Sequence, residues 1–127
     1  MTKIEDQSEI QFRQVNPGWM QDDGPSRLAF IPTKKDGGKL SMDRSATTDA
    51  KSSFDDFKAQ GLTSGGVFGL TPQEFSAEPH SINCFESPLG HNPHHSHAEF
   101  SGLSSGQAKT KSQELRRKAI ARGKLYP

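Results

Sequence analysis

The chain has few of the residues that build a large hydrophobic core. Of its 127 residues, only 23 are Leu, Ile, Val or Phe, a share of about 18%. A share below about 20% is typical of disordered chains when the net charge is also high, but here the net charge is only +1. Eight of the 23 residues are phenylalanine. We therefore expect one small, phenylalanine-centred domain over residues 10–127, after a flexible polar N-terminus over residues 1–9.

Cysteine and long apolar runs are scarce as well. A single cysteine, Cys84, excludes an internal disulfide and fits a reducing compartment. No apolar run approaches the ~18 residues of a membrane-spanning helix, and the first residues lack the apolar segment of a secretory signal peptide. These features predict a cytoplasmic protein that does not bind a membrane. Because Cys84 alternates with Ile82 in an expected strand, we interpret it as a buried, inert thiol rather than a nucleophile.

The apolar pattern predicts a mostly antiparallel sheet with short helices. Strands are expected at residues 10–15, 27–32, 40–44, 65–71, 81–87 and 97–103. The second and third of these strands can form a hairpin around the polar turn at 34–39. Helices are expected at residues 47–61, 71–75 and 109–123, the first capped by Thr47 or Thr48 and the second by a Thr71–Glu74 capping box. No regular strand–helix–strand rhythm appears, which favours an α+β fold with two or three short helices.

Charge is divided unevenly along the chain. Residues 1–105 carry 9 basic and 14 acidic side chains, a net charge of −5, whereas residues 106–127 carry 7 basic and 1 acidic, a net charge of +6. A basic C-terminal helix can bind nucleic acid or an acidic partner, or it can dock on its own acidic body through a thin stripe of Leu115 and Ala119. The candidate partner-binding residues are Trp19, Arg116, Arg117 and Arg122.

The stretch GHNPHHSHAEF at 90–100 places four histidines within seven positions. His95 and His97 are two residues apart, so an extended chain would direct both side chains to one face, where they can bind one Zn²⁺. A further ligand can come from His80, Cys84, His91, His94 or Glu99. Neither a Cys-x-x-Cys pair nor a His-Glu-x-x-His motif is present. A polar loop without a metal therefore remains the alternative to a zinc site.

An alternative hypothesis is a catalytic site in the same region that uses no metal. If the expected strands are neighbours, Arg13, Ser41 and His97 can converge, with arginine binding an anion and histidine acting as acid or base. The order of Arg13, Ser41 and the late Glu99 resembles the ADP-ribosyltransferase pattern. The Gln-x-Glu or Glu-x-Glu step of that family is absent around Glu99 and Glu74.

Four stretches resemble a group of small uncharacterised bacterial proteins: FRQVNPGW, LAFIPTKKDGGKLSMDR, GVFGLT and NPHHSHAEF. The resemblance covers residues 11–100. In that group the late strand follows Asn-Pro and begins His-Ala, which here matches Asn92-Pro93 and His97-Ala98. Two extra residues also allow His95 to be the counterpart. The resemblance implies a bacterial source and one intact domain, and the group has no established activity.

Taken together, these features favour a small cytoplasmic accessory protein that binds a macromolecular partner, most simply a protein. The alternative is a small enzyme or metal protein with a site around His97, Arg13 and Ser41. A concave pocket that joins Arg13, Ser41 and His97 would favour the enzyme. An exposed apolar patch that includes Trp19 would favour the binding protein.

Overall fold

A computed structural model describes residues 2–127 and confirms the α+β fold with a mostly antiparallel sheet. Six strands pair antiparallel in the order β1-β7-β8-β5-β2-β6, and β3 and β4 form a separate ribbon. The strands are β1 (Thr2–Lys3), β2 (Gln11–Gln14), β3 (Met20–Gln21), β4 (Gly24–Pro25), β5 (Lys39–Arg44), β6 (Val67–Leu70), β7 (Cys84–Glu86) and β8 (His95–Glu99). The helices are α1 (Ala50–Ala59), α2 (Pro72–Ser76) and α3 (Ser105–Arg122), with 3-10 turns η1 (Pro17–Trp19), η2 (Arg27–Phe30) and η3 (Lys34–Asp36).

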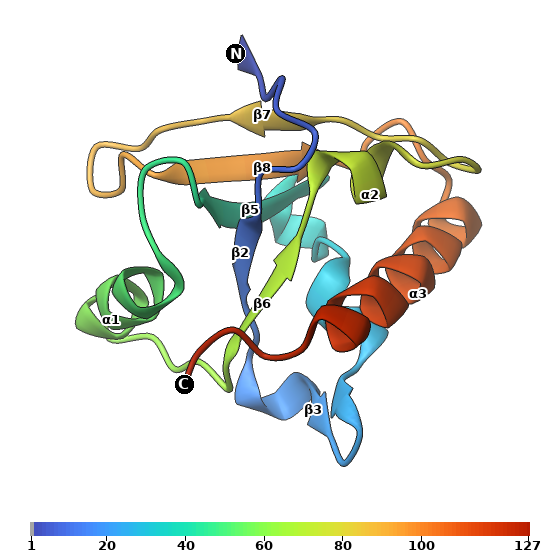
Figure 1. Cartoon of the computed structure of the whole chain (residues 1–127). Coiled ribbons are helices and arrows are strands. Elements are labelled where there is room, and N and C mark those ends of the chain that lie inside the picture. Colours follow the sequence, from blue (N-terminus) through green and yellow to red (C-terminus); the bar gives the residue numbers. More distant parts are fainter. Residues whose placement is uncertain (1) are drawn as a thin grey trace.

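The sheet has a core face and an outer face. The alternation of side chains along β5 and β8 shows which residues belong to each face. Leu40 and Met42 alternate inward and are buried, whereas Ser41 between them is exposed. Figure 1 shows α1 and α3 on opposite sides of β2 and β6. The core lies on the α3 side, where Phe30, Phe75 and Phe100 are among its buried aromatic side chains. The expected phenylalanine-rich core is therefore present.

Helix α3 is docked on the body of the protein. Its stripe of Leu115 and Ala119 is buried in the core, as the one-turn spacing of these residues predicts. The helix begins at a capping box formed by Ser104 and Gln107. None of the helices in residues 2–127 has the length and apolar composition that a bilayer crossing requires.

The prediction of a strand at residues 27–32 is wrong, and so is the hairpin with 40–44. This segment forms the 3-10 turn η2, and β5 pairs with β2 and β8 instead. A strand would send the consecutive Ala29 and Phe30 to opposite faces, but both are fully buried here. The 3-10 turn lets both side chains enter the core beside α3.

The N-terminal segment at 1–9, for which we expected flexibility, takes part in the sheet from residue 2 onward, and Met1 lies outside the described residues. Strand β1 pairs with β7, and Ile4 is buried while its N–H donates to the carbonyl of Cys84. The apolar Ile4 in an otherwise polar stretch explains this, because its burial fixes the chain beside β7.

Gly69 in β6 packs closely against two side chains. A Cβ on this residue would lie 2.7 Å from Cδ1 of Leu125 and 2.8 Å from Cγ2 of Ile10. The returning C-terminal segment also pairs with this strand, since Val67 and Tyr126 form an isolated bridge. Close packing against Ile10 and the C-terminal segment therefore accounts for the glycine at this position.

A polar cluster is buried at one end of the core face. The guanidinium of Arg44 donates to both carboxylate oxygens of Glu9, at 2.9 and 2.8 Å, and to Glu86 at 3.0 Å. Gln11 donates to Glu9 and accepts from the buried hydroxyl of Ser96. Burial alone would raise the pKa of Glu9, but the hydrogen bonds from Arg44 and Gln11 outweigh it and lower that pKa. The cluster ties the segment before β2 to β5, β7 and β8.

We expect Arg44→Met to lower the free energy of unfolding by about 1–3 kcal/mol, because it leaves the carboxylate of Glu9 without its counter-ion. The pKa of Glu9 is lowered on folding, so this pair stabilises the protein above the ordinary glutamate pKa and less as the pH falls through the lowered value. The gap between wild type and variant in urea unfolding should therefore narrow at low pH. Lys51→Met, which breaks the exposed pair with Asp55, should leave stability unchanged. Equal losses for both variants would contradict this account.

Candidate functional site

A long groove crosses the outer face of the sheet. Three cavities, of about 230, 570 and 520 Å³, adjoin one another because they share lining residues. The first and second share Arg13, Gln14 and Phe57, and the first and third share Leu89 and His95. The groove therefore runs from Trp19 and Leu62 at one end to the strand β8 histidines at the other.

Arg13 lies at the junction of the first two cavities, where β2 and β5 stop pairing. Its Nε donates to the carbonyl of Ala29 at 2.8 Å, and its Nη1 donates to the carbonyl of Ser41 at 2.9 Å. The guanidinium carbon also lies 5.9 Å from the ring centre of Trp19. Burial lowers the pKa of Arg13 to about 10, partly offset by the charge of Asp36. The side chain therefore remains a cation at neutral pH.

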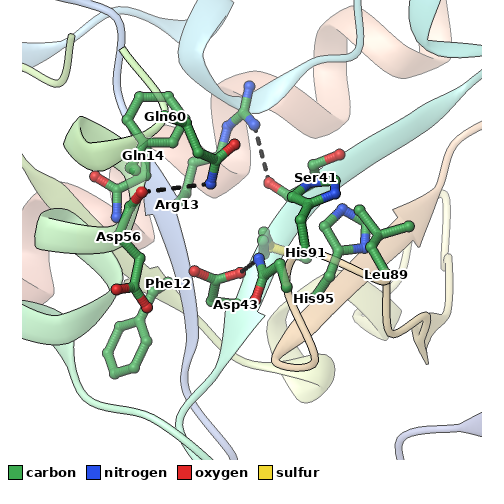
Figure 2. A pocket seen from close by; sticks show the side chains of 13 residues that line it. Phe12, Arg13, Gln14, Ser41, Asp43, Asp56, Gln60, Leu89, His91 and His95 are labelled. Atoms are coloured by element: carbon green, nitrogen blue, oxygen red, sulfur yellow. Dashed lines mark hydrogen bonds between the residues drawn. The ribbon is translucent and has the colours of Figure 1, made fainter. Parts of the chain in front are cut away.

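The cation of Arg13 has no counter-ion at close range. Within residues 2–127, no carboxylate forms an ion pair with it, and Nη2 makes no hydrogen bond. Figure 2 shows its guanidinium directed toward the carbonyl of Ser41. The nearby Asp43 is already engaged, since it accepts from Ser53 and Asn92. Nη2 of Arg13 therefore carries donors that no group in residues 2–127 uses, and the residue lines both cavities.

The predicted meeting of Arg13, Ser41 and His97 is present only in part. Ser41 and His97 are direct partners in the pairing of β5 with β8, so their side chains share the outer face. Arg13, however, binds the backbone of Ser41 and not its hydroxyl. The three side chains thus border adjoining cavities instead of one reacting centre.

The four clustered histidines occupy different environments. His91 is exposed and lines the first cavity, and Nδ1 of His94 lies 2.9 Å from the hydroxyl of Thr47. His95 and His97 project from β8 to the outer face, as their spacing predicts. Strand β8 begins at His95, two residues before the expected start.

His95 and His97 both turn Nδ1 toward one serine, Ser87. The hydroxyl oxygen of Ser87 lies 2.9 Å from Nδ1 of each ring. His97 is only 1% exposed and stacks on Phe85, with ring centres 5.6 Å apart. Nε2 of His97 lies 3.5 Å from Oε2 of Glu99 and has no other partner in the described chain. The sequence reading missed Ser87, because a serine after a short strand carries no signal of its own.

Burial lowers the pKa of both histidines. For His95 the hydrogen bond to the Ser87 carbonyl opposes this effect, and for His97 the charge of Glu99 opposes it. Both rings are therefore neutral at pH 7. Neutral imidazole can accept a proton or bind a metal ion, but residues 2–127 contain no group of three or more His, Cys, Asp or Glu side chains placed to hold one. The candidate zinc ligands His95 and His97 thus lack a third ligand in this arrangement.

The predicted partner-binding arginines are mostly used within the chain. Arg116 donates to the carbonyl of Pro25 and pairs with Asp23 at 2.8 Å. Arg122 donates to the carbonyl of Gly69 and pairs with Glu74 at 2.8 Å. Arg117 is exposed on α3. The basic helix therefore uses two of its arginines to dock on the acidic body.

Trp19 and Cys84 lie in contrasting places. Trp19 is partly buried against the core while it lines the second cavity. Cys84 is buried, and desolvation raises the pKa of its thiol to about 12. The thiol is thus uncharged at neutral pH, and the structure supports an inert role for it.

The fold and groove define a small α+β protein with a concave outer sheet face. Comparisons with protein-family models, characterised proteins and solved structures found no match to this chain. Any assignment of function therefore rests on the groove and on the residues that border it.

We expect Arg13→Lys to destabilise the protein by about 1–3 kcal/mol, because an ammonium cannot satisfy both carbonyls in the fixed fork geometry of a guanidinium. The midpoint of urea unfolding measures this loss. Arg117→Lys, at an exposed arginine of α3, is the matched control and should not change the midpoint. A stable Arg13→Lys variant would show that the two hydrogen bonds contribute little.

The buried histidines predict a pH-dependent stability. Folding lowers the pKa of His95 and His97, so the unfolded chain binds protons more readily below the ordinary histidine pKa of about 6.5. The free energy of unfolding should therefore rise with pH from the lowered pKa values up to about 6.5 and then level off. Urea unfolding at a series of pH values tests this, and His97→Gln should reduce the slope. If the free energy of unfolding of His97→Gln depended on pH as steeply as that of the wild type, His97 would not be a source of the pH dependence.

Proposed function

We propose that the protein binds a protein partner, and that the outer-face groove takes an extended partner segment with a carboxylate opposite Arg13. The observation that carries the proposal is a guanidinium without an ion pair within residues 2–127, at the junction of two adjoining cavities. A lean core also suits a protein that gains stability from a partner.

The lining of the groove supports this choice of ligand. Trp19, Phe57 and Leu62 give one end an apolar surface, and Leu62 is 47% exposed. Leu89, 40% exposed, borders the groove at its other end. Exposed apolar side chains beside a concave surface are typical of protein interaction sites. An extended segment can contact both ends, whereas a small molecule in one cavity cannot.

Charge complementarity favours an acidic segment. Arg13 lines both cavities and its Nη2 makes no hydrogen bond within residues 2–127. A bidentate pair with a carboxylate would use the guanidinium geometry well. The neutral histidines add no positive charge at pH 7. Nucleic acid is less well supported as a partner, because two cations of α3 are committed to Asp23 and Glu74 and the groove has only Arg13 as a buried cation.

The test uses native mass spectrometry of the untagged protein, co-expressed with its genomic neighbours. We expect a second polypeptide bound to the wild type, and we expect Leu62→Asp to reduce the bound fraction by tenfold or more, on the order of 1.4 kcal/mol. The aspartate places a charge where the partner needs an apolar surface.

Leu28→Asp is the matched control, because Leu28 is 46% exposed but is not among the groove-lining residues. It should leave the complex intact. A complex that survives Leu62→Asp but is lost in Leu28→Asp would place the interface elsewhere. Bound nucleic acid in place of a polypeptide would also overturn the proposal.

A further inference from the structure

Ser87 lies between two imidazole rings at the β7 end of the groove. Its N–H donates to the carbonyl of His95 at 3.0 Å, which fixes the backbone after β7. The side chain is half-buried and lines the third cavity together with His97.

The hydrogen-bond partners of His95 and His97 indicate which ring nitrogen of each carries a proton. Nδ1 of His95 is 3.0 Å from the carbonyl oxygen of Ser87, and a carbonyl can only accept, so His95 carries its proton on Nδ1. That one proton is shared between the carbonyl and hydroxyl oxygens of Ser87, and the hydroxyl can donate its own proton to Nδ1 of His97. His97 therefore carries its remaining proton on Nε2.

The Nε2 proton of His97 faces Glu99. The carboxylate oxygen Oε2 lies 3.5 Å from Nε2, which has no other partner in residues 2–127. Stacking on Phe85 holds the ring plane. The hydroxyl of Ser87, the imidazole of His97 and the carboxylate of Glu99 thus follow in the order that activates a serine nucleophile. Catalytic hydrogen bonds as long as the one between His97 and Glu99 commonly shorten when substrate binds.

We propose that Ser87 is a nucleophile that accepts an acyl group from a carboxylic ester, with His97 as its general base and Glu99 as the residue that positions His97. The activity goes beyond partner binding and does not depend on it.

The reaction balances with these groups and water. The oxygen of Ser87 forms a bond to the acyl carbon as its proton passes to Nδ1 of His97. The bond from the acyl carbon to the alcohol oxygen then breaks, and the alcohol leaves with that proton. In the second half, His97 takes a proton from water, the resulting hydroxide attacks the acyl carbon, and Ser87 leaves with the proton restored to its oxygen. The products are an alcohol and a carboxylic acid.

The cavity favours esters with small apolar acyl groups. Pro88 and Leu89 contribute apolar walls, and Lys39 lines the same cavity. Lys39 is the register partner of Glu99, so its ammonium lies near the relay and can stabilise the negative oxygen that forms during attack.

The test is reaction of the full chain with a fluorophosphonate, which phosphonylates activated serines, followed by intact mass and peptide mass spectrometry. We expect one adduct, located on Ser87 and absent from Ser87→Ala. His97→Gln should slow labelling by about 100-fold. Ser81→Ala removes an exposed serine that lines none of the three cavities and should label like the wild type.

A pH series separates catalysis from a structural role. The charged or titratable groups that act on His97 are Glu99 and His95 from β8 and Lys39 from β5. The labelling rate should rise with pH while His97 loses its proton and reach a plateau by pH 7. Glu99→Gln, at a side chain 28% exposed, should keep the fold but slow labelling by about tenfold.

Three results would overturn the proposal. They are no adduct on Ser87 under conditions that label a known serine hydrolase, a labelling rate that does not change in Glu99→Gln, and equal labelling of Ser87→Ala. Leu62→Asp distinguishes the two proposals, because it should disrupt partner binding while leaving the labelling of Ser87 unchanged.

Discussion

The guanidinium of Arg13 joins three segments at the place where β2 and β5 separate. The two strands pair only at Gln11 and Phe12, although β2 continues beside β6 as far as Gln14. Past that point Arg13 supplies the donor that a backbone N–H of β2 would have supplied to Ser41. It also holds the carbonyl of Ala29 in η2. This one side chain thus keeps the carbonyls of Ser41 and Ala29 hydrogen-bonded at the place where the two strands separate.

The helices cover the two faces of the sheet unequally. Helix α3, η2 and α2 cover the core face, and α1 covers only part of the outer face, through Ser53 and its bonds to Gln14 and Asp43. The cavities over the uncovered part are lined by Arg13 near one end and by the β8 histidines at the other. The two proposals use different parts of this one surface, an apolar and cationic part for a partner and a serine–histidine part for acyl transfer.

The sequence predicted the elements whose patterns are local. Alternation identified β5 through Leu40 and Met42, and the capping box at Thr71 and Glu74 identified α2. The pattern of apolar residues wrongly predicted a strand around Ala29 and Phe30. Both residues are buried by a 3-10 turn, and such a short turn has no periodic sequence pattern that would identify it. The pairing of Ser41 with His97 could be anticipated only as a possibility. Ser87 could not be anticipated, since its contact with both histidines depends on the register of β7 against β8.

The central claim is that the outer sheet face, opened at Arg13, is the working surface of the protein. Amide hydrogen exchange of the protein alone and with its bound partner tests this most directly. The account predicts that the partner slows exchange in peptides covering residues 12–19, 57–63 and 88–95, which border the groove. Slowed exchange confined to residues 27–30 and 109–118, in η2 and α3, would contradict it.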